Sequence, residues 1–169
     1  MRNISAFVSL IVFTFFCLAC GGGETKSSSG STPEPSPPEV FAKGADISWI
    51  TELEVKGHKF YNASGEQREC TALMKELGLN AVRLRVWVNP QKHDNWCNKA
   101  DMLIKAQRAK ELGMDVMIDF HYSDWWADPG QQHKPAAWKN MNLTDLKKAV
   151  GEHTRDVLSA LKLKGITPK

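Results

Sequence analysis

Three short segments of the chain, at 44–49, 81–87 and 115–121, alternate apolar residues with polar or charged ones. Neighbouring side chains of a β-strand point to opposite faces, so each segment predicts a strand with one apolar face and one polar face. The chemically capable residues on the polar faces are Asp46, Arg83, Arg85, Trp87, Asp119 and His121. If the apolar faces pack on helices, these groups converge on the other side and must pair or remain in contact with water. Carboxylate and guanidinium groups placed in this way can hydrogen-bond the hydroxyl groups of a ligand.

Aromatic residues accompany these polar positions. The segment after residue 121 contains Tyr122, Asp124, Trp125 and Trp126, and all six tryptophans fall at predicted strand ends or in the connections that follow them. Indole faces stack on sugar rings, and carboxylates bind sugar hydroxyls, so this combination favours a carbohydrate ligand. Two alternatives stay open here: the rings could only fill the rim of the fold, and Arg83 could form a purely structural ion pair with Asp119.

A metal site is a weaker interpretation of the same region. Five potential ligands are close in sequence: Asp119, His121, Asp124, Asp128 and His133. No pair has a recognised ligand spacing, and the chain has neither a Cys-x-x-Cys nor a His-Glu-x-x-His motif, so we expect no metal and no cofactor. His93 stands in a polar context and is expected at the surface.

An internal repeat indicates how these segments are connected. Residues 75–82 (KELGLNAV) recur 35 positions later as residues 110–117 (KELGMDVM), and each copy places a glycine between a helical pattern and a β-branched segment. A third helical pattern ends at Gly165 in the same way. Strands that alternate with helices predict a parallel sheet with right-handed crossovers. A fourth strand is expected to begin near Ile166.

The helices follow from apolar residues at helical spacing. The first helix carries the apolar positions Cys70, Leu73, Met74 and Leu77, with Ser64 as a possible N-cap. Comparable patterns precede Gly113 and Gly165. About 130 residues after position 39 are roughly half of what a (β/α)₈ barrel needs, so we expect the N-terminal part of such a barrel, about three βα units that are truncated before strand 4.

The first forty residues have a different composition. Residues 1–20 have a charged start, a short apolar stretch and a small-residue cleavage site at Cys20, which resembles a bacterial lipoprotein signal. We therefore expect an exported protein, held at the cell envelope only by a lipid on Cys20, with plain secretion as the alternative. Residues 21–40 are rich in Gly, Ser and Pro and predict a flexible linker. Residues 41–169 would form the folded domain.

Charge and cysteine content restrict the remaining possibilities. The net charge of +3 is scattered, which gives no support for nucleic-acid binding. After the signal only Cys70 and Cys97 remain, and an exported compartment would permit a disulfide between them.

Three motifs together resemble a known family. Residues 44–48 (GADIS), 82–90 (VRLRVWVNP) and 119–129 (DFHYSDWWADP) are similar, in order and spacing, to the arabinogalactan endo-β-1,4-galactanases of glycoside hydrolase family 53. The similarity runs from about residue 41 to the last residue. It implies a (β/α)₈ barrel that cuts internal β-1,4-galactosidic bonds of type I arabinogalactan by a retaining mechanism, with the galactan polysaccharide as partner.

The resemblance also implies roles for individual residues. Arg83 would steady the nucleophilic carboxylate, and His121 would line the subsite where the bond is cut. Galactose units would be contacted by Asp46, Trp87, Asn89, Tyr122, Asp124 and Trp126. Arg85, near a strand end, joins the expected substrate-binding residues, whereas Trp49 replaces a residue that is more often serine in this family.

Both catalytic glutamates of the family are expected beyond Lys169, at the ends of the fourth and seventh strands. Glu39, Glu52 and Glu152 do not replace them, because none stands at the end of a predicted strand. Two hypotheses follow. The chain is the N-terminal part of a galactanase and is inactive by itself, or it is a non-catalytic, lipid-anchored carbohydrate-binding remnant.

Overall fold

The computed structural model describes residues 41–169. The predicted signal (1–20), the linker (21–40) and the lipidated Cys20 lie outside the described residues. Within residues 41–169, no helix is both long and apolar enough to cross a membrane.

The centre of the fold is a parallel sheet of three strands in the order β1-β4-β5. The strands are β1 (Gly44–Asp46), β4 (Ala81–Val86) and β5 (Asp115–Phe120). The central strand β4 pairs with β1 at one edge and with β5 along its whole length at the other. The prediction of three parallel strands is confirmed. Because the strands are parallel, their carboxyl ends all lie at one edge of the sheet.

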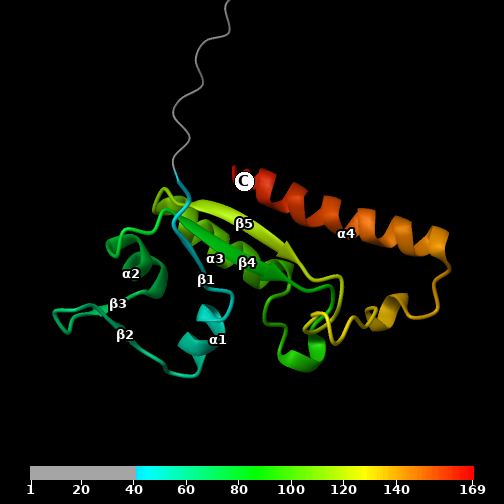
Figure 1. Cartoon of the computed structure of the whole chain (residues 1–169), viewed down its shortest axis with the longest axis horizontal. Coiled ribbons are helices and arrows are strands. Elements are labelled where there is room, and N and C mark those ends of the chain that lie inside the picture. The colour runs from blue at the N-terminus through cyan, green and yellow to red at the C-terminus, as the bar shows by residue number, and fades with distance from the viewer. Residues whose placement is uncertain (1–40) are drawn as a thin grey trace, which may run out of the picture. The chain divides into compact units, whose positions relative to one another are not determined.

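Helices connect the strands and cover the apolar side of the sheet (Figure 1). They are α1 (Ile50–Val55), α2 (Cys70–Glu76), α3 (Lys99–Glu111) and α4 (Leu143–Leu163), with short 3₁₀ turns η1 (Gln91–His93) and η2 (Ala136–Trp138). Helix α3 packs against β4, β5 and α4.

The core forms where β4 meets α3. The side chains of Val82, Leu84 and Val86 are at most 1% exposed, as the alternation in β4 predicts. They share one cluster of buried residues with Met102, Ala106, Ala109, Val116, Val157 and Leu161. Burial of side chains of this size contributes about 1.5–3 kcal/mol each, so this cluster fixes which face of the sheet the helices cover.

The glycine signals of the repeat end the helices as predicted. Gly78, Gly113 and Gly165 all have positive φ, and each donates its N–H to a carbonyl in the last helical turn. The following residue in each case donates to a carbonyl five positions earlier, which is the Schellman geometry. This geometry turns the chain from the helix toward the next strand.

The first strand is shorter than the alternation predicted, and a short helix follows it. The Ser48 N–H donates to Oδ1 of Asp46 at 2.9 Å, and the Ile50 N–H donates to the Ile47 carbonyl. These bonds turn the chain immediately after Asp46, so α1 begins at Ile50. An Asp side chain that binds the backbone two residues later favours such a turn.

The predicted N-cap at Ser64 is wrong. Ser64 lies in the turn of a hairpin formed by β2 (Phe60–Tyr61) and β3 (Gln67–Arg68), where Asn62 Oδ1 accepts from the backbone N–H groups of Ser64 and Glu66. Helix α2 is instead capped by Glu69, whose carboxylate accepts from the Ala72 N–H at 2.8 Å.

The segment after α4 runs toward the outer edge of β5. Ile166 is buried, and the Lys169 N–H donates to the Val116 carbonyl at 3.0 Å. Residues 166–169 do not form a strand. The expected fourth strand is therefore not formed within the described residues, and this segment makes one backbone hydrogen bond to β5.

The disulfide that an exported compartment would permit between Cys70 and Cys97 is not formed in the structure, and both cysteines are free and buried. Cys70 belongs to the apolar core at the start of α2. The Cys97 thiol donates to the Ser48 carbonyl at 3.4 Å. The two thiols therefore have separate partners, which the spacing of the cysteines in the sequence does not reveal.

A buried ion pair ties α3 to the segment after β1. Lys105 is completely buried, and its Nζ contacts Asp101 Oδ2 at 2.6 Å and the Ser48 carbonyl at 2.7 Å. The same Asp101 oxygen accepts from the Cys97 N–H at 2.6 Å. This network holds the start of α3 beneath the carboxyl end of the sheet.

Lys105→Met is expected to lower the free energy of unfolding by about 3 kcal/mol, because it leaves the charge of Asp101 buried without its cation. Urea denaturation followed by circular dichroism measures this difference. Lys148→Met is the matched control, since that exposed lysine makes only a 3.8 Å pair and should change stability by less than about 0.5 kcal/mol. Equal effects of the two substitutions would refute the structural role of Lys105.

The thiols of Cys70 and Cys97 should resist alkylation in the folded chain. Burial raises the pKa of Cys70 to about 11, aided by the negative charge of Glu69, and burial also raises the pKa of Cys97. At pH 8 roughly a thousandth of Cys70 is the reactive thiolate. Peptide mass spectrometry should find both residues labelled by iodoacetamide in urea without reductant and almost unlabelled in buffer. Failure to label them in urea would show that they are oxidised.

Candidate functional site

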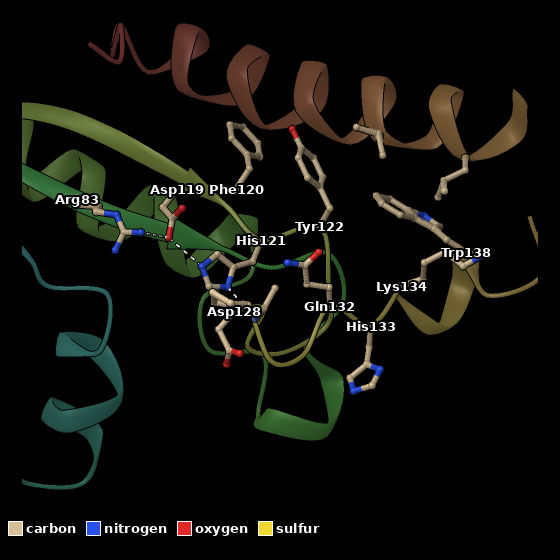
Figure 2. A pocket seen from close by; sticks show the side chains of 14 residues that line it. Arg83, Asp119, Phe120, His121, Tyr122, Asp128, Gln132, His133, Lys134 and Trp138 are labelled. Atoms are coloured by element: carbon tan, nitrogen blue, oxygen red, sulfur yellow. Dashed lines mark hydrogen bonds and ion pairs between the residues drawn. The ribbon is translucent and has the colours of Figure 1, made fainter. Parts of the chain in front are cut away.

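A row of charged groups crosses the carboxyl edge of the sheet on its polar side. Arg83 of β4 lies between two carboxylates, with Nη1 at 2.8 Å from Asp46 Oδ2 and Nη2 at 2.6 Å from Asp119 Oδ2. Asp119 Oδ2 is also 2.9 Å from Nε2 of His121 (Figure 2). The parallel register creates this row, because it aligns Asp46 with Arg83 and brings the end of β5 beside β4.

Hydrogen bonding fixes the tautomer of His121. Its Nδ1 accepts from the Trp87 indole N–H at 3.3 Å and from the Ala127 backbone N–H at 3.4 Å. Both of these groups are donors only, so Nδ1 carries no proton in the neutral ring. The proton is therefore on Nε2 and is donated to Asp119.

Asp46 is held as a carboxylate. Burial opposes its ionisation, but hydrogen bonds from Ser48 and the positive charges of Arg85 and Arg83 outweigh burial and lower the pKa of Asp46 below its ordinary value. This carboxylate is therefore an acceptor of hydrogen bonds and a poor proton donor near neutral pH.

Beside this row, three indoles surround a buried guanidinium, and a fourth packs against one of them. The Cζ atom of Arg85 lies 4.0 Å from the ring centroid of Trp126 and 4.7 Å from those of Trp49 and Trp87. Trp125 packs on Trp87 with ring centroids 4.6 Å apart. These rings come from the ends of β1, β4 and β5, so the predicted gathering of tryptophans at the strand ends is present in the structure.

Two predicted substrate-binding residues need correction. Arg85 is 1% exposed and Trp87 is completely buried, so neither side chain reaches the surface of the site. Alternation along β4 directs both to the polar side, but the tryptophans from neighbouring strand ends cover them. Both side chains pack against the other indoles at the strand ends.

Three other predicted residues lie along the loops at the strand ends. The two carboxylate oxygens of Asp124 accept from the backbone N–H groups of Asn89 and Ala136 at 2.9 and 2.8 Å. Asp124 thus joins the connection after β4 to the connection after β5. The Tyr122 hydroxyl bonds Thr154 of α4 at 2.9 Å, and Asn89 is exposed.

Two neighbouring pockets open at this edge. The larger, about 580 Å³, is lined by the charged row from Arg83 to His121, together with Tyr122, Asp128 and one side of Trp138 (Figure 2). The smaller, about 350 Å³, contains Asn89, Asp124, Trp125 and Trp126. His133 and Lys134 line both pockets, so the loop after β5 separates them.

One residue that lines the smaller pocket was not predicted from the sequence. His93 was expected at the surface, but its ring stacks on Trp125 with centroids 3.5 Å apart and an angle of 21° between the rings. It is the last residue of η1, in an irregular connection where no periodic pattern indicates the direction of a side chain.

The residues of the weaker metal interpretation do not form a metal site. Within residues 41–169, no three side chains of His, Cys, Asp or Glu are arranged so that they could hold an ion. Asp119 is bound to Arg83 and His121, while the Asp128 carboxylate accepts from the N–H groups of its own loop.

Known proteins are similar to this chain over part of their length. The chain is 36% identical over 132 residues to an endo-β-1,4-galactanase of Bacillus subtilis, which is 75% of this chain and 31% of that protein. A solved fungal β-1,4-galactanase matches with a TM-score of 0.72 and 35% identity, over 76% of this chain and 38% of the other. A family 53 catalytic domain of Ignisphaera aggregans matches with a TM-score of 0.69 and 38% identity, over 81% and 40%.

The chain thus spans about a third of the length of the curated relatives it matches. Its three βα units correspond to the N-terminal part of a (β/α)₈ barrel, and the expected fold class is confirmed. The model of the family described as glycosyl hydrolase family 53 matches residues 42–169, which contain all the strands and pockets of the site. The chain therefore belongs to glycosyl hydrolase family 53.

Proposed function

We propose that the chain is the galactan-binding N-terminal part of an endo-β-1,4-galactanase. The observation that carries this proposal is the charged row and the indole cluster at one edge of a family 53 sheet. Hydroxyl groups of a sugar can bond to Arg83, Asp46 and Asp119, while the half-buried ring of Trp126 offers an apolar face.

The reaction requires groups other than these carboxylates. Retaining hydrolysis uses two carboxyl groups about 5–5.5 Å apart, and one of them must first donate a proton to the leaving oxygen. Asp46 has a lowered pKa and Asp119 accepts from both Arg83 and His121, so neither is suited to that step. We infer that the acid and the nucleophile are glutamates outside residues 41–169, and that Arg83 would face the nucleophile.

Arg83 has the exposure that this role requires. Its side chain is 45% exposed at the edge of the larger pocket, although it pairs with two carboxylates. A guanidinium has more N–H donors than those two bonds use, so it can also bind an incoming carboxylate or hydroxyl group. The family resemblance implies galactose contacts at Asn89, Tyr122, Asp124 and Trp126, which line one or the other pocket, with His121 beside the cut bond.

Export and anchoring are part of the proposal. A lipoprotein signal at residues 1–20 would place the protein at the bacterial cell envelope through Cys20, where a polysaccharide too large to enter the cell is accessible. A cleaved secretory signal is the alternative, and mass spectrometry of the mature N-terminus distinguishes a lipidated cysteine from a free one.

The 169-residue chain should bind β-1,4-galactan without cutting it. Affinity electrophoresis in gels that contain β-1,4-galactan measures binding, and a reducing-sugar assay measures cleavage. Retardation by galactan, with none by β-1,4-glucan, is expected together with no release of reducing ends. Trp126→Ala should weaken retardation by about tenfold, whereas Trp96→Phe, outside the indole cluster, should not change it.

Two results would contradict this assignment. Measurable cleavage would show that the chain contains a carboxyl pair that we have not recognised. Binding of glucan in preference to galactan would reject the proposed substrate class. Binding with no cleavage in any longer product of the same gene would favour the alternative of a non-catalytic carbohydrate-binding protein.

Removal of the Arg83 charge should raise the pKa of Asp46. In Arg83→Gln the burial of Asp46 remains while one of its favourable charges is lost, so an NMR titration should place its pKa higher than in the unchanged chain. The stability that ionised Asp46 contributes is lost as the pH falls from its unfolded-state pKa through its folded-state pKa, so the total loss should be smaller in the variant and complete at a higher pH. Arg68→Gln, which removes a pair in the hairpin, is the control and should leave Asp46 unchanged.

A further inference from the structure

The guanidinium of Arg85 is buried without a carboxylate partner. Among residues 41–169 no carboxylate forms an ion pair with it, and its Nε has no hydrogen-bond partner. The bond that it does make is weak, from Nη2 to the Cys97 sulfur at 3.5 Å. A buried cation in such surroundings is costly, and an apolar side chain of similar volume would fill the space without that cost. Stability alone therefore does not explain an arginine at this position.

The neighbours of Arg85 indicate what the charge does. Trp49, Trp87 and Trp126 surround the guanidinium, and their ring centroids lie 5.9–6.1 Å from one another. A planar cation attracts the faces of indole rings, and the attraction is strongest away from water. One cation thus sets the orientation of three rings that come from three different strand ends.

One of these rings is a donor to the histidine of the charged row. The Trp87 indole N–H at 3.3 Å and the Ala127 N–H at 3.4 Å both donate to His121 Nδ1, which leaves the proton on Nε2 for the bond to Asp119. Asp119 in turn holds Nη2 of Arg83. A change in the orientation of Trp87 would remove the shorter of the two bonds to Nδ1 and weaken the preference for the tautomer in which Nε2 donates to Asp119.

We propose that Arg85 is a positioning residue for the site: its guanidinium orients the Trp87 indole, and this indole, together with the Ala127 N–H, holds His121 in the tautomer that donates to Asp119. The inference rests on the proposed function only in taking this edge as the sugar-binding surface. The tautomer of His121 can be measured without any sugar, so the two proposals can fail separately.

The test uses the 169-residue chain with ¹⁵N-labelled histidine at about pH 9, where a free imidazole is neutral. Long-range ¹H–¹⁵N spectra distinguish a protonated ring nitrogen from an unprotonated one. In the unchanged chain His121 should show a single tautomer with Nδ1 unprotonated. Arg85→Met should fold and keep its circular dichroism spectrum, but His121 should show averaged tautomers and the Trp87 indole proton should exchange faster with water.

Three further variants make the result decisive. Arg85→Lys keeps the charge but lacks the planar group, so it should lose the single tautomer as Arg85→Met does. Trp87→Phe removes only the indole donor and should also release the tautomer while Arg85 is present. Arg108→Met removes a partly buried arginine that pairs with Glu54 and Glu69, and it should leave the signals of His121 unchanged.

Retention of the single tautomer in Arg85→Met or in Trp87→Phe would overturn the proposal, because the indole or its orientation would then not control His121. Failure of both Arg85 variants to fold would also overturn it, since Arg85 would then support the whole fold. Galactan retardation of Arg85→Met adds a functional readout, and an unchanged affinity would limit the role of Arg85 to His121.

Discussion

The alternation of side chains along β4 is the constraint on which the rest of the structure depends. This central strand is covered on one side by helix α3, which requires Val82, Leu84 and Val86 to face the core. Because side chains alternate along a strand, the intervening residues Arg83 and Arg85 must both point to the other side of the sheet. A shift of one residue in the pairing with β5 would bury charges in the core and expose valines, so the register and the site are specified together.

The two arginines on that face have different environments because of their distance from the end of the strand. Arg83 lies where β1 and β5 contribute Asp46 and Asp119, so its charge is balanced by carboxylates and remains accessible. Arg85 is two residues further along, beyond the end of β1 but still paired with β5. The groups available there are indoles, and these surround a cation without neutralising it.

Secondary structure was predicted best where burial requires apolar residues at a regular spacing. It was predicted worst where the contacts come from irregular connections. Strands β4 and β5 and the glycine ends of the helices followed from local patterns that the core enforces. The hairpin before α2 was missed because its strands are only two residues long and carry no clear alternation. Ser64 was assigned as a cap on residue type alone, whereas the turn that Asn62 stabilises left Glu69 at the start of the helix.

The same difference between regular strands and irregular connections explains which site residues could be predicted. Asp46, Arg83, Asp119 and His121 were expected together because parallel strands bring their carboxyl ends to one edge, and no other information is needed. The covering of Arg85 could not be predicted, since it requires that Trp49 and Trp126, 77 positions apart in the numbering, approach the same guanidinium. Nor could the separate partners of the two thiols, because Cys97 reaches Ser48 only through the connection between β4 and α3.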